Sequence, residues 1–156
     1  MKLTYQVEKF SAVWPELCPL TILHWSEIHP GREKDYRPNV KQYEHFNDIG
    51  FLHVFTARHC GELVGQAVIY VTESMHTQEK MAREDTLYFL PEFRRGRNAI
   101  DFLKFIEKTL SSMGVKEIYA TAPEKAGRVL TFLGYDKTMN VYQKFTGAAD
   151  VRTRAA

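Results

Sequence analysis

The sequence has few cysteines, no long apolar run and no excess of charge of one sign. Its two cysteines, Cys18 and Cys60, form no CxxC pair, which argues against a disulfide framework or a cysteine zinc site, and we expect two free thiols. No window approaches the roughly 18 apolar residues of a membrane-spanning helix, and the segment MKLTYQVEKF has no signal-peptide core, so we expect a cytoplasmic protein. With 21 basic and 19 acidic residues, bulk charge does not point to a polyanion partner.

The composition that is present fits one folded domain. Hydrophobic residues make up 44% of the 156 positions, aromatic residues 13% and charged residues 26%, the profile of a globular chain that can bury a core. This length leaves no room for a second domain. We therefore expect a single domain over residues 1–146 and a flexible tail over residues 147–156.

Hydrophobic periodicity and turn residues divide the domain into strands and helices. Apolar residues that recur three and four apart predict a helix from Asn98 to Met113, which Gly114 would end. Strands are predicted over 3–10, 51–58, 63–71, 84–90, 116–122 and 140–145. Further helices are predicted from an entry at Pro15 and Pro19 to about residue 28, over 40–49 and over 124–135. This order describes a mixed sheet with helices on its faces.

Three arginines surround a glycine in the stretch FLPEFRRGRNAIDF, residues 89–102. A strand, a loop with a glycine and the start of a long helix together present unpaired backbone N–H groups to one anion, and the helix dipole adds to the attraction. The side chains of Arg94, Arg95 and Arg97 would add charge-assisted hydrogen bonds to phosphate oxygens. A solvated turn is the alternative interpretation of this spacing.

This stretch, extended to LYFLPEFRRGRNAIDFLKF and followed further along the chain by LTFLGY, resembles the GCN5-related N-acetyltransferase (GNAT) superfamily. The pyrophosphate loop of that superfamily reads R/Q-x-x-G-x-G/A after a strand that ends near a proline. Arg94 fills the first position and Ala99 the last, whereas Arg97 stands in place of the central glycine and Gly96 comes one residue early. The segments VFTARHCGELVGQAVIYV and YQKF are similar to a branch common in phages and prophages, in which arginines often surround a shifted glycine.

The resemblance implies a fold, a donor and a donor site. The fold would be α/β and GNAT-like, with a mixed, mostly antiparallel sheet of six to seven strands and about four helices on its faces. The donor would be acetyl-CoA, as a co-substrate. The backbone of Tyr88, Phe89 and Leu90 would pair with the pantetheine arm of CoA. The pyrophosphate would be held by residues 94–99, which are Arg94, Arg95, Gly96, Arg97, Asn98 and Ala99.

Acyl transfer needs the acceptor amine in its neutral form, which an amine with a pKa of ~10.4 rarely adopts at pH 7. A general base, acting directly or through water, therefore has to remove a proton. Glu84 and Asp85 open the strand beside the expected thioester, and alternation puts them on opposite faces, so only one can face the acceptor. We favour Asp85, because the similar sequences carry an acid there. The alternative is a solvated carboxylate or a pair with Arg83.

The acceptor and the leaving group have weaker candidates. His24 and Glu27, three apart on one helix face, are candidates for the acceptor pocket, and His76, in the loop before the strand, is a candidate base or substrate contact. All three could equally be surface residues. Many superfamily members carry a tyrosine four residues before the glycine of the GF/GY pair as general acid, but Leu130 stands there. Tyr142 or water is the candidate in its place.

Other chemistries have little support in the sequence. No cluster of histidine, cysteine or aspartate has metal-site spacing, and no catalytic triad is suggested, so neither a metal nor a covalent mechanism is indicated. Aromatic residues of the predicted strands, Tyr70 among them, are assigned to the core.

Three functions remain open on the sequence. The leading hypothesis is an N-acetyltransferase whose acceptor is a primary amine of a small molecule or a macromolecule, with homodimerisation left open and no membrane partner. The second is a nucleic-acid-binding module in which the arginines and the exposed Lys104 and Lys108 form a stripe, interrupted by acidic residues. The third is a catalytically inactive protein that binds CoA.

Overall fold

The computed structural model describes residues 2–144 and 146. It has four α-helices, five strands and two short 3-10 helices in these residues. The strands are β1 (Thr4–Glu8), β2 (Leu52–His59), β3 (Glu62–Glu73), β4 (Lys80–Phe89) and β5 (Val115–Tyr119). The helices are α1 (Phe10–Ile28), η1 (Glu33–Asp35), α2 (Val40–Asp48), η2 (Pro91–Phe93), α3 (Asn98–Ser112) and α4 (Glu124–Phe132).

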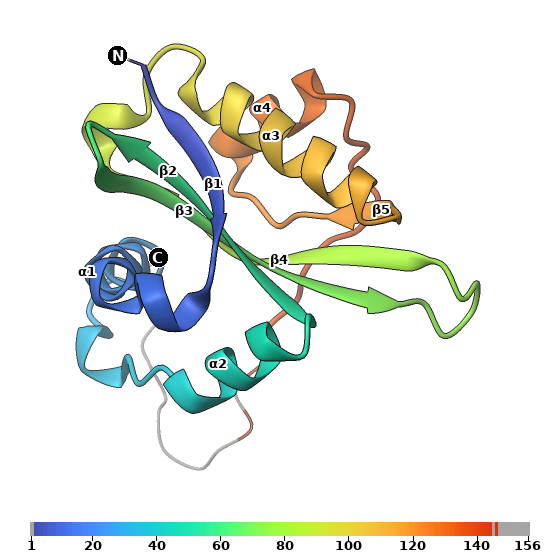
Figure 1. The fold of residues 1–156 in the computed structure, drawn as a ribbon, viewed down its shortest axis with the longest axis horizontal. Helices are drawn as coiled ribbons and strands as arrows, with labels where there is room; N and C mark the ends of the chain where they lie inside the picture. The colour runs from blue at the N-terminus through green and yellow to red at the C-terminus, as the bar shows by residue number, and fades with distance from the viewer. Residues whose placement is uncertain (1, 145, 147–156) are drawn as a thin grey trace.

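The five strands form one sheet in the order β1-β2-β3-β4-β5, between two layers of helices. Neighbouring strands run antiparallel from β1 to β4, and β5 runs parallel to β4. Helices α1 and α2 lie on one side of the sheet, and α3 with α4 lies on the other (Figure 1). One core cluster lies between α3 and the sheet, and a second lies between α1 and the opposite face. The expected α/β class, mostly antiparallel sheet and four helices are confirmed.

Helix α1 begins at Phe10 and contains Pro15 and Pro19, so the predicted entry at the prolines is wrong. Each proline costs about 3 kcal/mol inside a helix, because it removes one backbone hydrogen bond. Burial of one large apolar side chain returns about 1.5–3 kcal/mol. Four residues at helical spacing are buried beneath α1, which outweighs the two prolines: Phe10, Val13, Leu17 and Leu20.

The sheet has five strands in the described residues, so the expected six to seven is wrong. Residues 140–144 of the predicted last strand are irregular, and residue 145 lies outside the described residues, as does the predicted tail over 147–156. Val141 and Tyr142 are mostly exposed. A strand needs a partner to satisfy its backbone groups, and an alternation of residue types does not supply one.

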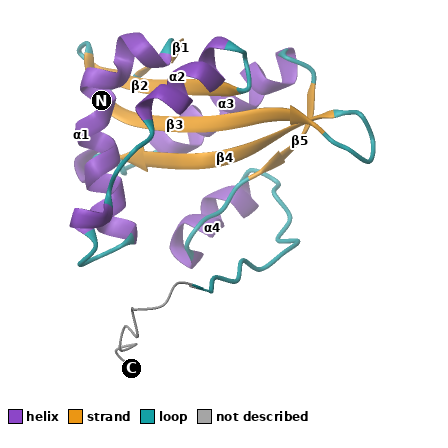
Figure 2. Cartoon of the chain, turned by 90° about the horizontal axis from the view of Figure 1, so that it is seen from below, coloured by secondary structure: helices purple, strands orange, loops and turns teal. Residues whose placement is uncertain are grey.

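Strands β4 and β5 pair over only a short stretch. Their pairing runs from Lys80 to Arg83 of β4, and β5 ends at Tyr119 while β4 continues to Phe89 (Figure 2). The second half of β4 therefore has β3 on one side and no paired strand on the other among the described residues.

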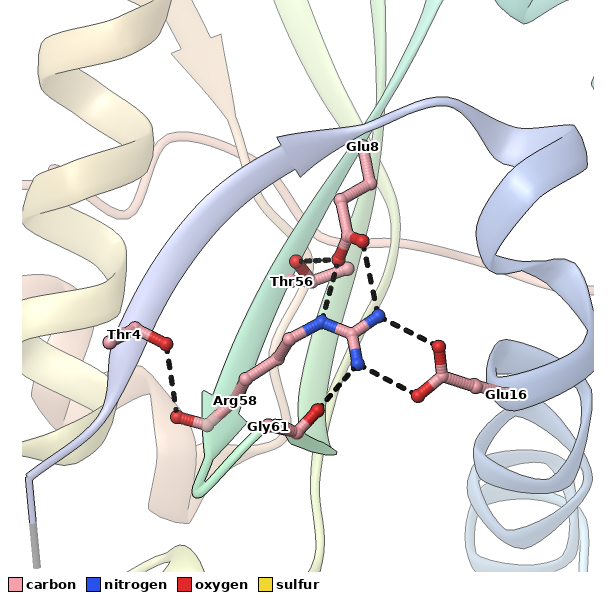
Figure 3. Close-up of polar contacts among 6 residues, drawn as sticks. All are labelled: Thr4, Glu8, Glu16, Thr56, Arg58 and Gly61. Carbon is pink, nitrogen blue, oxygen red and sulfur yellow. Dashed lines mark hydrogen bonds and ion pairs between the residues drawn. The ribbon is translucent and has the colours of Figure 1, made fainter.

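A charged network joins β1, β2 and α1 (Figure 3). The Arg58 guanidinium, with only 11% of its side chain exposed, donates to both carboxylate oxygens of Glu8 and both of Glu16, and to the Gly61 carbonyl. Thr56 also donates to Glu8. Hydrogen bonds from Arg58 hold the pKa of Glu16 below its ordinary value. One cation thus satisfies two carboxylates from different elements.

Arg58→Ala is expected to lower the free energy of unfolding by about 3 kcal/mol at pH 7, because it leaves the Glu8 carboxylate without its cation. The loss should shrink as the pH falls below 4.5, the ordinary pKa of Glu16. A carboxylate whose pKa is lowered in the folded protein stabilises the fold while it is charged, and this contribution is lost as the carboxylate becomes protonated. Urea unfolding at pH 7 and pH 3 measures both. Lys9→Ala, which removes the exposed Lys9–Asp48 pair, is the control and should cost under ~1 kcal/mol.

No helix in the described residues is both long enough and apolar enough to cross a membrane.

Candidate active site

A pocket of about 560 Å³ lies between α1, α2, the segment that joins them and the sheet. The sheet contributes Val68 and Tyr70 of β3 and Asp85 and Thr86 of β4. The volume of the pocket is in the range of small-molecule sites, ~300–1,000 Å³. The sequence-predicted base Asp85 and the predicted acceptor residue His24 both line it.

Asp85 reaches the pocket through a β-bulge. Thr86 pairs with Val68 and Glu84 pairs with Ile69, so Asp85 is the extra residue of β4 between two consecutive partners on β3. A bulge re-aims a side chain and locally interrupts alternation. Asp85 and Thr86, neighbours in the chain, therefore both line the same pocket.

Two tyrosines surround the Asp85 carboxylate. The Tyr43 hydroxyl of α2 donates to Asp85 Oδ2 at 2.9 Å, and Tyr70 of β3 also hydrogen bonds to this carboxylate. Burial raises the pKa of Asp85, and the two tyrosine hydrogen bonds oppose part of that rise. Burial and the Asp85 charge raise the pKa of Tyr43, so both tyrosines stay protonated donors at neutral pH. A carboxylate with a raised pKa is a stronger base than an exposed one.

Asp85→Asn is expected to stabilise the fold more at pH 7 than at pH 3. A carboxyl whose folded pKa lies above its ordinary value of 3.8 loses its favourable contribution as the pH rises through the folded pKa, and asparagine has no such dependence. Urea unfolding of both proteins at the two pH values measures the difference. If the stability of the variant relative to wild type were lower at pH 7 than at pH 3, the result would contradict a carboxylate whose pKa is raised by burial.

Glu84 points elsewhere. Its carboxylate accepts a hydrogen bond from the Thr121 backbone N–H at 3.1 Å, where the chain leaves β5. Burial raises the pKa of Glu84, and the Thr121 hydrogen bond opposes this. Glu84 therefore holds the segment after β5 next to β4 at the point where the two strands separate. It does not line the pocket that contains Asp85.

Arg94 links α1 to the end of β4. Its guanidinium makes two hydrogen bonds to Glu27, at 2.8 and 2.6 Å, and its Nε donates to the Phe89 carbonyl at 2.8 Å. The guanidinium also lies 4.9 Å from the ring centre of Tyr88, and His24 lies 5.4 Å from that ring. His24, Glu27 and Arg94 thus form one cluster, in which burial lowers the pKa of His24.

The loop from Arg94 to Ala99 carries a free helix end. Gly96 has a φ of +64°, a left-handed turn conformation that favours glycine, and a Cβ there would meet no atom within 4 Å. Arg97 is the N-cap of α3, and no side chain caps this end. The first-turn amides of α3 can therefore bind an anion. Arg95 and Arg97 are exposed beside them, Arg97 in a loose 3.5 Å pair with Asp101.

The unpaired side of β4 exposes particular backbone groups. The Leu90 N–H donates to the Val64 carbonyl, so in an antiparallel ladder Tyr88 and Leu90 direct their polar groups to β3, while Leu87 and Phe89 direct theirs away. The bond from Arg94 to the Phe89 carbonyl agrees with this alternation. Contact with a pantetheine arm stays a prediction, and Leu87 and Phe89 are the residues placed to make it.

Two predicted site residues lie apart from the pocket. His76 is exposed on the turn between β3 and β4, where its backbone N–H donates to the Ser74 hydroxyl. Tyr142 is 89% exposed in the irregular segment after α4. Neither lines the pocket. In residues 2–144 and 146, no group of three or more histidine, cysteine, aspartate or glutamate side chains could hold a metal ion.

The structure adds pocket residues that the sequence did not single out. Tyr70, assigned to the core, lines the pocket beside Asp85, and Tyr43 comes from a helix whose function was unassigned. Gln66 is fully buried under the same sheet face, where it accepts a hydrogen bond from Thr86, and its Nε2 has no hydrogen-bond partner in the described residues. The alternation of residue types along a strand does not reveal a bulge. The sequence therefore carried no signal that these residues lie together around Asp85.

Solved structures of acetyltransferases share this fold. An aminoglycoside acetyltransferase from an uncultured soil metagenomic sample superposes with a TM-score of 0.77 at 15% identity, over 94% of this chain and 100% of that one. A GCN5-related N-acetyltransferase from Ralstonia eutropha gives 0.75 at 13% identity, with the same coverage. A predicted acetyltransferase from Clostridium acetobutylicum, solved with acetyl-CoA, gives 0.68 at 12% identity, over 92% of this chain and 96% of that one.

These likenesses establish that the chain has the GNAT fold over nearly its whole length. The sequence matches no protein-family model and no curated protein.

Proposed function

We propose that the protein is an N-acetyltransferase that transfers the acetyl group of acetyl-CoA to a primary amine bound beside Asp85. The observation that carries this proposal is the position of Asp85 on β4. Asp85 lines the pocket, and the unpaired backbone groups of Leu87 lie two residues along the same strand. At ~3.3 Å per residue, an acceptor at Asp85 and a thioester at Leu87 would be within reacting reach.

The residues of the chain fit a CoA-like donor. The free N-terminal turn of α3, with Arg95 and Arg97 beside it, suits a pyrophosphate, and the unpaired edge of β4 suits an amide-containing arm. Arg94 is assigned a different purpose, because three of its five N–H donors are already bonded to Glu27 and Phe89. In this proposal Arg94 positions α1 over the end of β4, and the exposed arginines meet the phosphates.

The reaction needs two protons to leave the ammonium form of the acceptor. Asp85 takes the first, directly or through a water, which gives the neutral amine. The amine nitrogen then bonds to the acetyl carbonyl carbon, and the Leu87 N–H stabilises the charge that develops on the oxygen. The C–S bond breaks, and the nitrogen loses its second proton as the CoA sulfur gains one, directly or through water. A thiol with a pKa near ~8.5 is a tolerable leaving group, so no tyrosine is required at Leu130.

Calorimetric titration with acetyl-CoA tests the donor half of this proposal. We expect one site with a dissociation constant in the micromolar range, and acetate with free adenosine should not reproduce it. A parallel titration with duplex DNA at 50 and 200 mM salt tests the nucleic-acid alternative, which predicts a steep loss of affinity with salt. Absence of acetyl-CoA binding at high micromolar concentration would rule out the proposed function.

A further inference from the structure

The pocket beside Asp85 is lined largely by aromatic side chains. Rings from α1, α2 and the connecting segment face it together with Tyr70 of the sheet. Several of them contact one another: Phe10 stacks on Trp14 and on Tyr43 at 5.1 and 5.3 Å, and Trp25 lies 5.7 Å from Tyr36. The Tyr36 hydroxyl is fixed by a 2.6 Å hydrogen bond to Thr21. The walls are therefore held in place and present apolar surface to an acceptor.

The pocket contains little negative charge. Asp85 is the carboxylate on its sheet side, while the other lining carboxylate, Asp35, is exposed on the connecting segment and bonded to Arg32 at 2.9 Å. Arg37 also lines the pocket and adds a positive charge. An acceptor with several ammonium groups would find one partly buried carboxylate, Asp85, because the exposed Asp35 is already bonded to Arg32 and the exposed Arg37 opposes its charge. Unpaired charges that lose water on binding are costly.

We propose that the acceptor is a small primary monoamine carried by an aromatic or other bulky apolar body. Its ammonium group would meet Asp85, and its ring would lie among Trp25, Tyr36 and Tyr70. This inference rests on the proposed function and narrows it to one substrate class. It would separate the chain from the fold relative that is named as an aminoglycoside acetyltransferase.

A matched amine panel tests the substrate class. 2-Phenylethylamine and ethanolamine have one primary amine of similar basicity and differ mainly in the ring. Burial of a phenyl group predicts a kcat/KM roughly 10- to 100-fold higher for 2-phenylethylamine, with acetyl-CoA as donor and thiol release as readout. Tobramycin and spermidine, as polycations, should be poorer than 2-phenylethylamine.

Tyr36→Ala should reduce the ratio of the two kcat/KM values at least about threefold, while Tyr36→Phe, which keeps the ring, should preserve it. Neither change should alter the affinity for acetyl-CoA, which calorimetry checks independently. Equal rates for the matched pair, or a preference for tobramycin or spermidine, would overturn the inference and leave the proposed function standing. Acetyl-CoA binding with no turnover of any panel amine would overturn it too, whereas absent acetyl-CoA binding would overturn both.

Discussion

Asp85→Asn is expected to lower kcat/KM for amine acetylation roughly 10²- to 10⁴-fold, the usual contribution of a general base. Asparagine keeps the size of the side chain and can still accept the hydrogen bond from Tyr43, so the pocket should keep its shape. It cannot take a proton from the ammonium form of the acceptor. Raising the pH should partly restore the rate of the variant, because the fraction of free amine grows with pH.

Asp48→Asn is the matched control for this change. Asp48 ends α2, is mostly exposed and pairs with Lys9 on the surface, away from the pocket. The same chemical substitution there should leave kcat/KM within about twofold. Acetyl-CoA affinity should be unchanged in both variants. An Asp85→Asn protein that retains wild-type kcat/KM at pH 7 would show that the proton leaves by another route.

The double substitution Arg95→Glu/Arg97→Glu is expected to weaken acetyl-CoA binding at least ~100-fold. Each lost hydrogen bond to a charged group costs about 1.5–3 kcal/mol, and the new carboxylates would repel the pyrophosphate. Both arginines are exposed, so the fold should tolerate the change. Calorimetry with acetyl-CoA gives the affinity, and urea unfolding confirms that the protein is intact.

Lys104→Glu/Lys108→Glu makes the same change in charge further along the exposed side of α3. If the arginines act on one bound anion, this control should weaken acetyl-CoA binding less than about fivefold. Equal losses in the two double variants would mean that only the overall charge of α3 matters. Such a result would favour the stripe of basic residues expected of a nucleic-acid surface.

Local patterns predicted much of the fold. The helix from Asn98 is present almost as expected, because its apolar spacing coincides with buried Phe102, Ile106 and Leu110, and because Gly114, at a φ of +86°, ends it. Prolines misled the prediction at α1, where burial outweighs their cost. The prediction of a last strand over 140–145 was wrong because residue type alone does not make a strand. Tyr142 is of a type common in strands, but it has no partner strand in the described residues.

Pocket residues were predictable where residue type and position within one segment were enough to select them. Asp85 was predicted as one of two acids that open a strand; β4 begins earlier, at Lys80, but the structure does put Asp85 in a pocket with His24. The bulge at Asp85 and its contact with Tyr43, 42 positions earlier in the chain, depend on tertiary packing, which periodicity does not contain. The contact of Arg94 with the pyrophosphate stays a prediction, and its bond to Glu27, 67 positions away, depends on tertiary packing in the same way.

The most direct test of the account is the mass of the product formed from 2-phenylethylamine and acetyl-CoA. We expect an amine heavier by one acetyl group, formed in step with free CoA thiol, and formed at least about 100-fold more slowly by Asp85→Asn. Release of thiol at the same rate without an amine, or acetylated amine formed equally fast by Asp85→Asn, would contradict the central claim that Asp85 prepares a bound amine to attack the thioester.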